Sequence, residues 1–305
     1  MKKLLRISLL VFVSFTSNYA YCWSLSLTDF GADGAYLVST QEQLHRLVIF
    51  SGLDFSSVAS VGSKGSAPGQ FLLPLAALVD SKKRLWVCDT LNNRIQILDF
   101  NGTPISEPGF SFGELGLDKP NAIVDDRVGS IYILDSGNKR VIAFDYTGKF
   151  VSEIKLEGED LSPVGIAVDR VKKKLYVLNM APARVDWYHL DSKRQGGSFG
   201  KYGIGDGDLL VPLHLTTDKE GNVYVSDDQA NRITKFNYLG KYLSSWGYFG
   251  VEKNSLYHPQ GIAVSDEGRL YVLDYGNHRG VVYDTKGIVL GEFGSGAINS
   301  DAQFK

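Results

Sequence analysis

The sequence predicts an all-β protein, a six-bladed β-propeller in which every blade is a four-stranded antiparallel sheet. A block of about 46 residues recurs along the chain, which is the period of a propeller blade. Each block holds four short runs rich in β-branched and aromatic residues, separated by polar turns. No helical period competes over a comparable length. Six blocks nearly fill the chain after residue 22, so we expect one propeller over residues 23–305 and no second domain.

Residues 1–22 have the pattern of a secretory signal peptide. Basic residues open the chain, a largely apolar run over residues 9–15 is too short for a permanent membrane span, and small residues follow up to Ala20. We expect cleavage between Ala20 and Cys22 and a periplasmic or secreted mature protein without a transmembrane span. A buried N-terminal helix is the alternative. The bulky Tyr21 disfavours a lipid anchor on Cys22, which stays the minority interpretation.

Charge and cysteine content exclude several classes of protein. The formal net charge is −2 at pH 7, which argues against nucleic-acid binding through phosphate neutralisation. Two cysteines are too few for a disulfide scaffold or a typical zinc site. Cys88 lies in the apolar run LWVCDT, so we expect a small core residue there. A Cys22–Cys88 bridge requires that cleavage leaves Cys22 in the mature chain.

Five blocks contain the same marker residues, a Pro, an Asp or Asn and an Arg, in the same order. Each starts at a proline, and the prolines lie 43 to 49 residues apart: Pro74, Pro120, Pro163, Pro212 and Pro259. The second run ends in Asp or Asn with an Arg five residues later: Asp89–Arg94, Asp135–Arg140, Asn179–Arg184, Asp227–Arg232 and Asp274–Arg279. In the last block the strands are expected at 261–264, 270–273, 280–283 and 288–292. A weaker first block over residues 24–62 lacks the proline and the Asp, with Ser39 near that place.

The blocks resemble NHL repeats at these residues. The NHL pattern of Pro-x-Gly-Ile-Ala-Val-Asp, then Leu-Tyr-Val-x-Asp, then Gly-Asn-x-Arg is closest in the last block, which contains PQGIAVSD, LYVLD and GNHR. The resemblance is strong over residues 71–294 and weak over 24–70. It implies an NHL-type six-bladed β-propeller. We expect the first and last blades to abut without exchanging a strand.

The recurring Asp and Arg residues are expected to build the blades, because a residue needed once per blade is usually structural. Asp at a strand end accepts bonds from turn amides, and Arg pairs with it. Asparagines suit the following turn, where a positive φ is tolerated: Asn92, Asn93, Asn138, Asn231 and Asn277. In this interpretation Asn179 is a mild defect.

Function is expected where the blades differ, first at the central channel. The residues that begin the innermost strands form the predicted channel entrance, together with His214: Leu75, Asn121, Val164, Leu213 and Gln260. Three of the five are aliphatic and two are neutral amides, so none of them suits acid–base catalysis or zinc binding. We therefore expect no catalytic residue, no metal and no cofactor.

Two enzyme classes on similar propellers remain as the alternative. Peptidyl-hydroxyglycine amidating lyases are NHL-like propellers that hold zinc through several histidines, and lactonase-like propellers hold a divalent cation through Glu, Asn and Asp. The resemblance makes His214, His258 and Asn121 the candidates for a metal-dependent lyase or hydrolase here. A role in a cell-surface electron-transfer or adhesion assembly is a third possibility, without a haem motif in this chain.

The loops between blades favour a binding function. They combine glycines with aromatic side chains on one rim of the propeller, which suits a protein, peptide or glycan partner. The predicted rim residues are Phe110, Phe112, Tyr202, Trp246, Tyr248, Phe249 and Tyr257. We expect about half of them to pack between blades instead. Basic turns on the opposite rim, such as 82–84 and 172–174, are expected to be solvated. The sequence thus favours a non-catalytic scaffold or recognition module.

Overall fold

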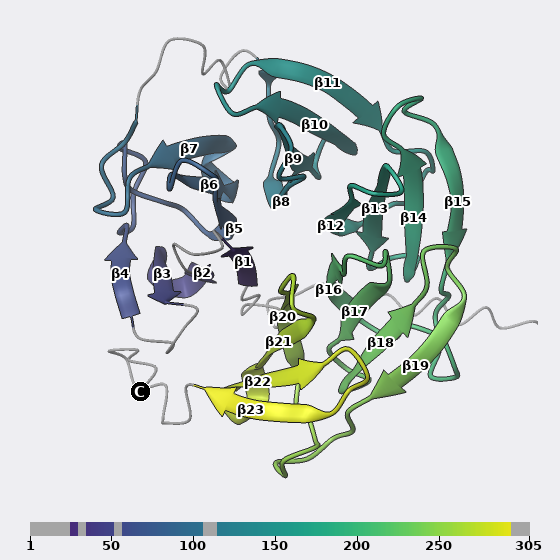
Figure 1. Cartoon of the computed structure of the whole chain (residues 1–305). Helices are drawn as coiled ribbons and strands as arrows, with labels where there is room; N and C mark the ends of the chain where they lie inside the picture. Colours follow the sequence, from purple (N-terminus) through teal and green to yellow (C-terminus); the bar gives the residue numbers. More distant parts are fainter. Residues whose placement is uncertain (1–24, 30–34, 52–56, 106–114, 294–305) are drawn as a thin grey trace, which may run out of the picture.

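The computed structural model describes residues 25–29, 35–51, 57–105 and 115–293, and these form a ring of six sheets around a central axis (Figure 1). The predicted signal peptide lies outside the described residues. Each sheet consists of consecutive antiparallel strands, and the first strand of each is innermost. The six-bladed all-β architecture predicted from the sequence is confirmed.

The strands of the first three blades follow the predicted order. Blade 1 comprises β1 (Leu25–Asp29), β2 (Ala35–Gln41), β3 (Arg46–Ser51) and β4 (Ser57–Val61). Blade 2 comprises β5 (Pro74–Val79), β6 (Leu85–Asp89) and β7 (Arg94–Leu98). Blade 3 comprises β8 (Pro120–Asp125), β9 (Ser130–Asp135), β10 (Arg140–Asp145) and β11 (Phe150–Lys155). A bridge from Leu98 to Pro104 continues blade 2 outward, and residues 106–114 beyond it are not described.

The last three blades are complete four-stranded sheets. Blade 4 comprises β12 (Pro163–Asp169), β13 (Lys174–Asn179), β14 (Arg184–His189) and β15 (Gln195–Phe199). Blade 5 comprises β16 (Pro212–Thr217), β17 (Val223–Asp227), β18 (Arg232–Phe236) and β19 (Tyr242–Trp246). Blade 6 comprises β20 (Pro259–Val264), β21 (Arg269–Asp274), β22 (Arg279–Asp284) and β23 (Val289–Phe293). Short 3₁₀ turns follow β2, β6 and β21 as η2 (Glu42–Leu44), η3 (Thr90–Asn92) and η5 (Tyr275–Asn277).

Apolar side chains fill each of the six interfaces between neighbouring blades. One cluster joins the first and last blades, where Leu37 and Phe50 pack with Tyr271 and Leu273. The innermost strand β1 also lies against β20. Among the described residues no strand crosses from one end of the chain into the blade at the other end. Burial of apolar surface therefore closes the ring.

Each of the five prolines begins an innermost strand, as predicted. Proline has no N–H to donate and is therefore tolerated at the first residue of a strand. The strand pairing shifts directly after each proline, so the next residue is the extra residue of a β-bulge next to the axis. Bulges redirect side chains, and these bulges set the orientation of the predicted channel-entrance residues.

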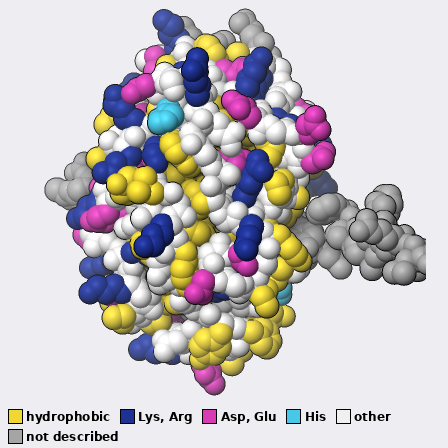
Figure 2. Space-filling view, turned by 90° about the vertical axis from the view of Figure 1, so that its right-hand side faces the viewer, with side chains coloured by type: hydrophobic (Ala, Val, Ile, Leu, Met, Phe, Trp, Pro, Cys, Tyr) yellow, Lys and Arg dark blue, Asp and Glu magenta, His cyan; other side chains and the backbone are white. Residues whose placement is uncertain are grey.

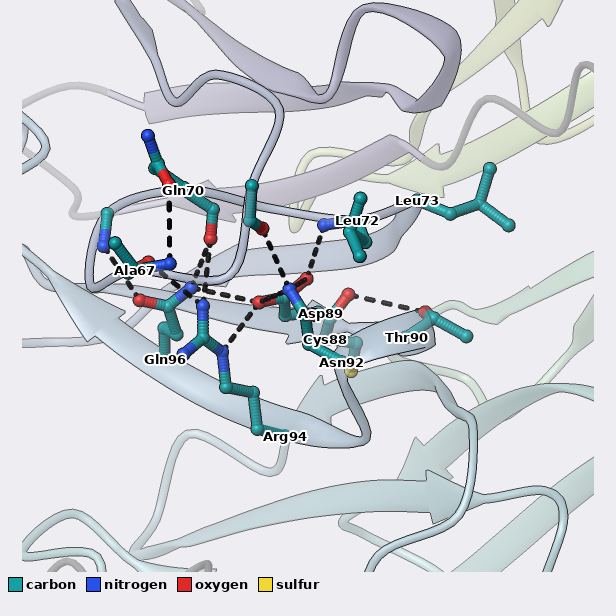
Figure 3. Close-up of polar contacts among 12 residues, drawn as sticks. Ala67, Gln70, Leu72, Leu73, Cys88, Asp89, Thr90, Asn92, Arg94 and Gln96 are labelled. Atoms are coloured by element: carbon teal, nitrogen blue, oxygen red, sulfur yellow. Dashed lines mark hydrogen bonds and ion pairs between the residues drawn. The ribbon is translucent and has the colours of Figure 1, made fainter.

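A buried carboxylate at the end of the second strand ties together three segments, an arrangement that we call the Asp–Arg clasp (Figure 3). In blade 2 the Asp89 carboxylate accepts the backbone N–H of Leu72 at 2.7 Å, the Asn92 amide at 2.9 Å and Arg94 Nε at 2.7 Å. The Arg94 guanidinium also donates to the carbonyl of Gln70 in the loop before the blade. The clasp therefore fixes the inter-blade loop to the turn between the second and third strands.

Blades 3 and 6 repeat the clasp with the same geometry. Asp135 accepts Arg140 Nε at 2.7 Å, and Asp274 accepts Arg279 Nε at 2.8 Å. In blade 5 Asp227 accepts two loop amides instead, while Arg232 donates to loop carbonyls. These bonds satisfy buried polar groups once per blade, which supports the structural interpretation of the repeated Asp and Arg.

Blade 1 lacks the Asp, as the sequence indicates, and a glutamine forms the clasp instead. Arg46 Nε donates to Gln41 Oε1 at 2.5 Å, and Gln41 lies five residues before Arg46, which is the spacing in the other blades. Ser39, the residue expected near that place, is buried within β2 and pairs with Leu25. A glutamine oxygen thus replaces the carboxylate.

Blade 4 exchanges the two partners of the clasp between strands. Asn179 occupies the usual Asp position, and its amide donates to Asp186 Oδ2 at 2.9 Å. Arg184 Nε donates to Asp186 Oδ1 at 2.8 Å. Desolvation raises the pKa of Asp186, while the nearby Arg184 acts in the opposite direction. Asn179 is therefore compensated by Asp186 on the next strand.

In the turn after the second strand, one residue has a positive φ and its neighbour bonds to the clasp carboxylate. In blades 2, 3, 5 and 6 positive φ falls on the residue directly before the Arg, which is Asn93, Asn231 or, against expectation, Lys139 or His278. The asparagines one residue earlier, Asn92, Asn138 and Asn277, donate to the clasp carboxylate instead. Asparagine at those three positions therefore contributes a side-chain amide donor and not a positive φ.

The basic turns on the opposite rim are only partly solvated, which corrects the expectation. Arg84 and Lys174 are buried. Arg84 pairs with Asp80, and the Lys174 ammonium lies 3.8 Å from the ring centroid of Trp187. Figure 2 shows other Lys and Arg side chains spread among acidic and apolar ones on the side that lies to the right in Figure 1. In the described residues we find no helix of the length and hydropathy that a membrane span requires.

The exchanged clasp of blade 4 predicts the outcome of a charge swap. Asn179→Asp alone places two buried carboxylates beside one guanidinium, so we expect the free energy of unfolding to fall by about 3 kcal/mol at pH 7. Adding Asp186→Asn restores one carboxylate at the usual position, and most of the loss should be recovered. Urea denaturation of the three proteins measures this, and equal stability of Asn179→Asp and wild type would contradict the assignment.

Candidate functional site

A cavity of about 180 Å³ lies on the propeller axis between the innermost strands β5, β8, β12, β16 and β20. Apolar side chains of the strands line part of its wall, and polar atoms contribute at least as much of the lining surface. The apolar lining residues include Leu78, Ile123, Val168, Leu215 and Val264. The hairpins between first and second strands form one end of the propeller, which we call the hairpin rim (residues 80–84, 126–130, 169–174, 218–222 and 265–269). The first residues of the hairpins in blades 3 to 6 line that end of the cavity.

The predicted channel-entrance residues lie toward the other end of the axis, and only two of them line the cavity. Those two are Asn121 and His214. The Asn121 amide donates to the carbonyl of Pro163 at 3.2 Å, which joins blades 3 and 4. The remaining entrance residues occupy the proline ends of their strands: Leu75, Val164, Leu213 and Gln260. Gln260 is buried.

His214 lies on the innermost strand β16 of the propeller and is neutral at pH 7. Desolvation by burial lowers its pKa to about 4. Its backbone N–H donates to Ser226 Oγ at 3.2 Å on the neighbouring strand. Burial removes water from the imidazole and disfavours its charged form, so His214 is neutral at pH 7.

His258 lies in a different environment, at the start of blade 6. Its Nδ1 is 2.9 Å from Asp228 Oδ2, which belongs to the turn after β17. Desolvation raises the pKa of Asp228, and the bond to His258 acts against that shift. The alternative metal site needs His214, His258 and Asn121 together. In the described part of the chain no group of three His, Cys, Asp or Glu side chains is placed to hold a metal ion.

The loops between blades and the turns after second strands share one end of the propeller, which we call the loop rim (residues 62–73, 115–119, 156–162, 200–211 and 247–258, with their clasped turns). Clasp bonds join both kinds of segment, as between Tyr257 and Asp274. The rim residues Tyr202, Tyr248 and Phe249 are exposed. Phe110 and Phe112 lie outside the described residues.

Two of the predicted rim aromatics pack against other side chains. Trp246 lies between Tyr224 and Tyr283, with ring centroids 6.1 Å away on both sides, and contributes to the interface of blades 5 and 6. Tyr257 meets Phe249 edge to face at 5.1 Å and lies 4.5 Å from the His258 ring. The exposed part of this rim is therefore carried by the loop tips.

The loops before blades 2, 5 and 6 have one shape, because each closes with a parallel bridge: Lys64–Phe71, Tyr202–Leu209 and Phe249–Leu256. At the two outermost positions the loops before blades 5 and 6 present apolar pairs. The exposed fractions are 73% for Tyr202, 76% for Ile204, 69% for Phe249 and 78% for Val251. The loop before blade 2 has Lys64 and Ser66 there. Ile204 and Val251 were not predicted as rim residues. Aligning the three loops on their bridges places them at equivalent positions.

His214 predicts a specific pH dependence of stability. The unfolded histidine has a pKa near 6.5 and the folded one a pKa of about 4, so the unfolded state takes up its proton first as the pH falls. The contribution of His214 to the free energy of unfolding is fully present above pH 6.5. It should decrease by about 3 kcal/mol as the pH falls toward 4. His214→Asn should remove most of this decrease, whereas His278→Asn, in an exposed turn, should not. Urea denaturation at several pH values measures the effect, and an unchanged slope in His214→Asn would contradict it.

Comparison with known proteins supports the repeat assignment. The family model described as "NHL repeat" matches residues 256–283, which include β20, β21 and most of β22. NHL repeat-containing protein 3 from Homo sapiens is 27% identical over 159 residues. The match covers 50% of this chain and 46% of that protein, so the chain spans about half the length of the curated relative that it matches.

Solved structures share the fold at low sequence identity. Virginiamycin B lyase from Staphylococcus aureus has a TM-score of 0.60 at 15% identity, covering 89% of this chain and 84% of that chain. A chain of the nidogen/laminin complex has a TM-score of 0.60 at 17% identity, covering 84% of this chain and 92% of that chain. Likeness at this level shows the fold alone. The chain is thus a six-bladed β-propeller whose last blade matches the NHL repeat over residues 256–283.

Proposed function

We propose that the propeller is a non-catalytic binding module that docks a protein or peptide partner on the loop rim of blades 5 and 6. The carrying observation is the pair of equivalent loop tips that expose Tyr202 with Ile204 and Phe249 with Val251. Large apolar side chains that face solvent on a soluble scaffold mark interaction sites when they gather on one face. The aliphatic members favour a protein surface over a glycan, which would mainly stack on the rings.

The clasps hold these loop tips in place before any partner binds. Arg232 donates to the carbonyls of Ile204 and Asp208, and Arg279 donates to those of Glu252 and Ser255. A loop fixed in this way loses little conformational entropy on binding, so more of the contact energy contributes to affinity. A structural neighbour, a chain of the nidogen/laminin complex, is part of a complex between proteins, which supports a protein partner for such a propeller.

The location of the protein belongs to the same proposal. The pattern over residues 1–22 supports export, with cleavage between Ala20 and Cys22, to a periplasmic or secreted form. A partner is then expected outside the cytoplasm, and capture experiments should start from the native envelope or the culture medium.

Loss of the loop-tip side chains predicts loss of the partner. Ile204→Ser with Val251→Ser removes apolar contacts without touching a clasp, so we expect recovery of a defined partner in quantitative pull-downs to fall at least about tenfold. The matched control is Val128→Ser with Val171→Ser, which removes two equally exposed aliphatic side chains from the hairpin rim. Equal recovery of every partner by both double variants would contradict the assignment of the loop rim.

A lyase is the competing function, and one observation favours it. His258 is held by Asp228 at a partly exposed position, as a general base requires. A structural neighbour is a catalytically inactive histidine-to-alanine variant of virginiamycin B lyase, solved with quinupristin. Turnover of quinupristin by the purified chain that disappears in His258→Ala, with stoichiometric metal by elemental analysis, would replace the binding proposal with the enzyme.

A further inference from the structure

The hairpin rim carries charged side chains around the end of the axial cavity. The residue that follows the turn-building Asp or Ser is Arg127 in blade 3, Arg170 in blade 4, Lys219 in blade 5 and Asp266 in blade 6. All four line the cavity. At this position of the hairpins three residues are cationic and one is acidic, and four further acids line the cavity.

Arg127 and Arg170 already hold a carboxylate across this mouth. Arg127 Nη1 lies 2.9 Å from Asp266 Oδ2, and Arg170 Nη2 lies 3.8 Å from the other oxygen of the same side chain. The Arg127–Asp266 pair joins blades 3 and 6, which are three blades apart in the ring of six. The Asp266 side chain is 51% exposed, so this pair is weak and its carboxylate can be exchanged.

The four other acids of the lining each accept hydrogen bonds within their own blade. Asp126, Asp169 and Asp218 are buried and accept backbone N–H groups of their own turns. Asp125 accepts the Tyr146 hydroxyl at 2.6 Å, and desolvation raises the pKa of its carboxyl. Among the five acids of the lining, Asp266 is the one that pairs with Arg127 and Arg170.

We propose that the cavity is a binding site for a small carboxylic acid with an apolar tail. The ligand carboxylate replaces Asp266 on Arg127 and Arg170, where charge-assisted bonds from guanidinium groups are strong and directional. The tail extends along the axis between apolar residues such as Ile123 and Val168. This site lies on the rim opposite the proposed partner surface, and it does not depend on that proposal.

Octanoate is the probe, and calorimetry on the purified chain measures its binding. We expect Arg127→Gln to weaken binding at least about tenfold, because one charge-assisted bond is lost. Asp266→Asn should act in the opposite direction and tighten binding about threefold, since it removes the internal competitor. The opposite signs separate a direct role in binding from general damage to the fold, which circular dichroism checks for each variant.

Three controls fix the chemistry of the site. Lys173→Gln removes a cation that pairs with Asp191 on the hairpin of blade 4 outside the cavity lining, and should leave binding unchanged. Octylammonium and 1-octanol carry the same tail without the anionic group and should bind much more weakly. Affinity for shorter acids should fall about fourfold per methylene removed.

Two results would overturn the proposal. One is the absence of octanoate binding to both wild type and Asp266→Asn. The other is binding that Arg127→Gln leaves unchanged or that 1-octanol matches, since the guanidinium groups would then play no part.

Discussion

A buried side-chain oxygen near the turn between the second and third strands is the group on which the rest of the propeller depends. In blades 2, 3 and 6 it belongs to an Asp that accepts bonds from the preceding loop, the turn and the third strand, as Asp89 does with Leu72, Asn92 and Arg94. Asp227 accepts loop amides in blade 5, and Asp186 of the third strand takes this role in blade 4. Removing one partner of such a buried network leaves the other polar groups without a hydrogen bond. The free energy of unfolding then falls by about 3–5 kcal/mol. Apolar packing holds neighbouring blades together, and these bonds anchor the loops that run between them, three of which are also closed by a parallel bridge.

The clasp also separates structural positions from variable ones. Residues that recur in every blade form strand ends, turns and loop anchors. The loop tips and hairpin tips are therefore the positions at which the blades differ. On the loop rim the difference is apolar, at Ile204 and Val251, and on the hairpin rim it is charged, at Arg127 and Asp266. One scaffold thus offers two surfaces of different chemistry, and the loops are already ordered when a partner arrives.

Period, strand boundaries and blade number were predictable from the sequence, because β-rich runs and prolines recur at fixed places in each blade. The exchanges within the clasp were not, since Gln41 and Asp186 compensate for missing residues through contacts that composition does not reveal. The orientation of Trp246 was equally hidden, because a rim aromatic and an interface aromatic have the same sequence context. The Arg127–Asp266 pair joins blades three apart, and only ring closure brings those residues together.

Hydrogen exchange of the loop amides that donate to the clasps tests this account most directly. These amides belong to Leu72, Asp118, Leu210 and Tyr257, all in inter-blade loops rather than in strands. The account predicts that they exchange as slowly as amides in the buried second strands, because opening them breaks a buried network. Exchange as fast as that of exposed turn amides would show that the loops are ordered by something other than the clasp.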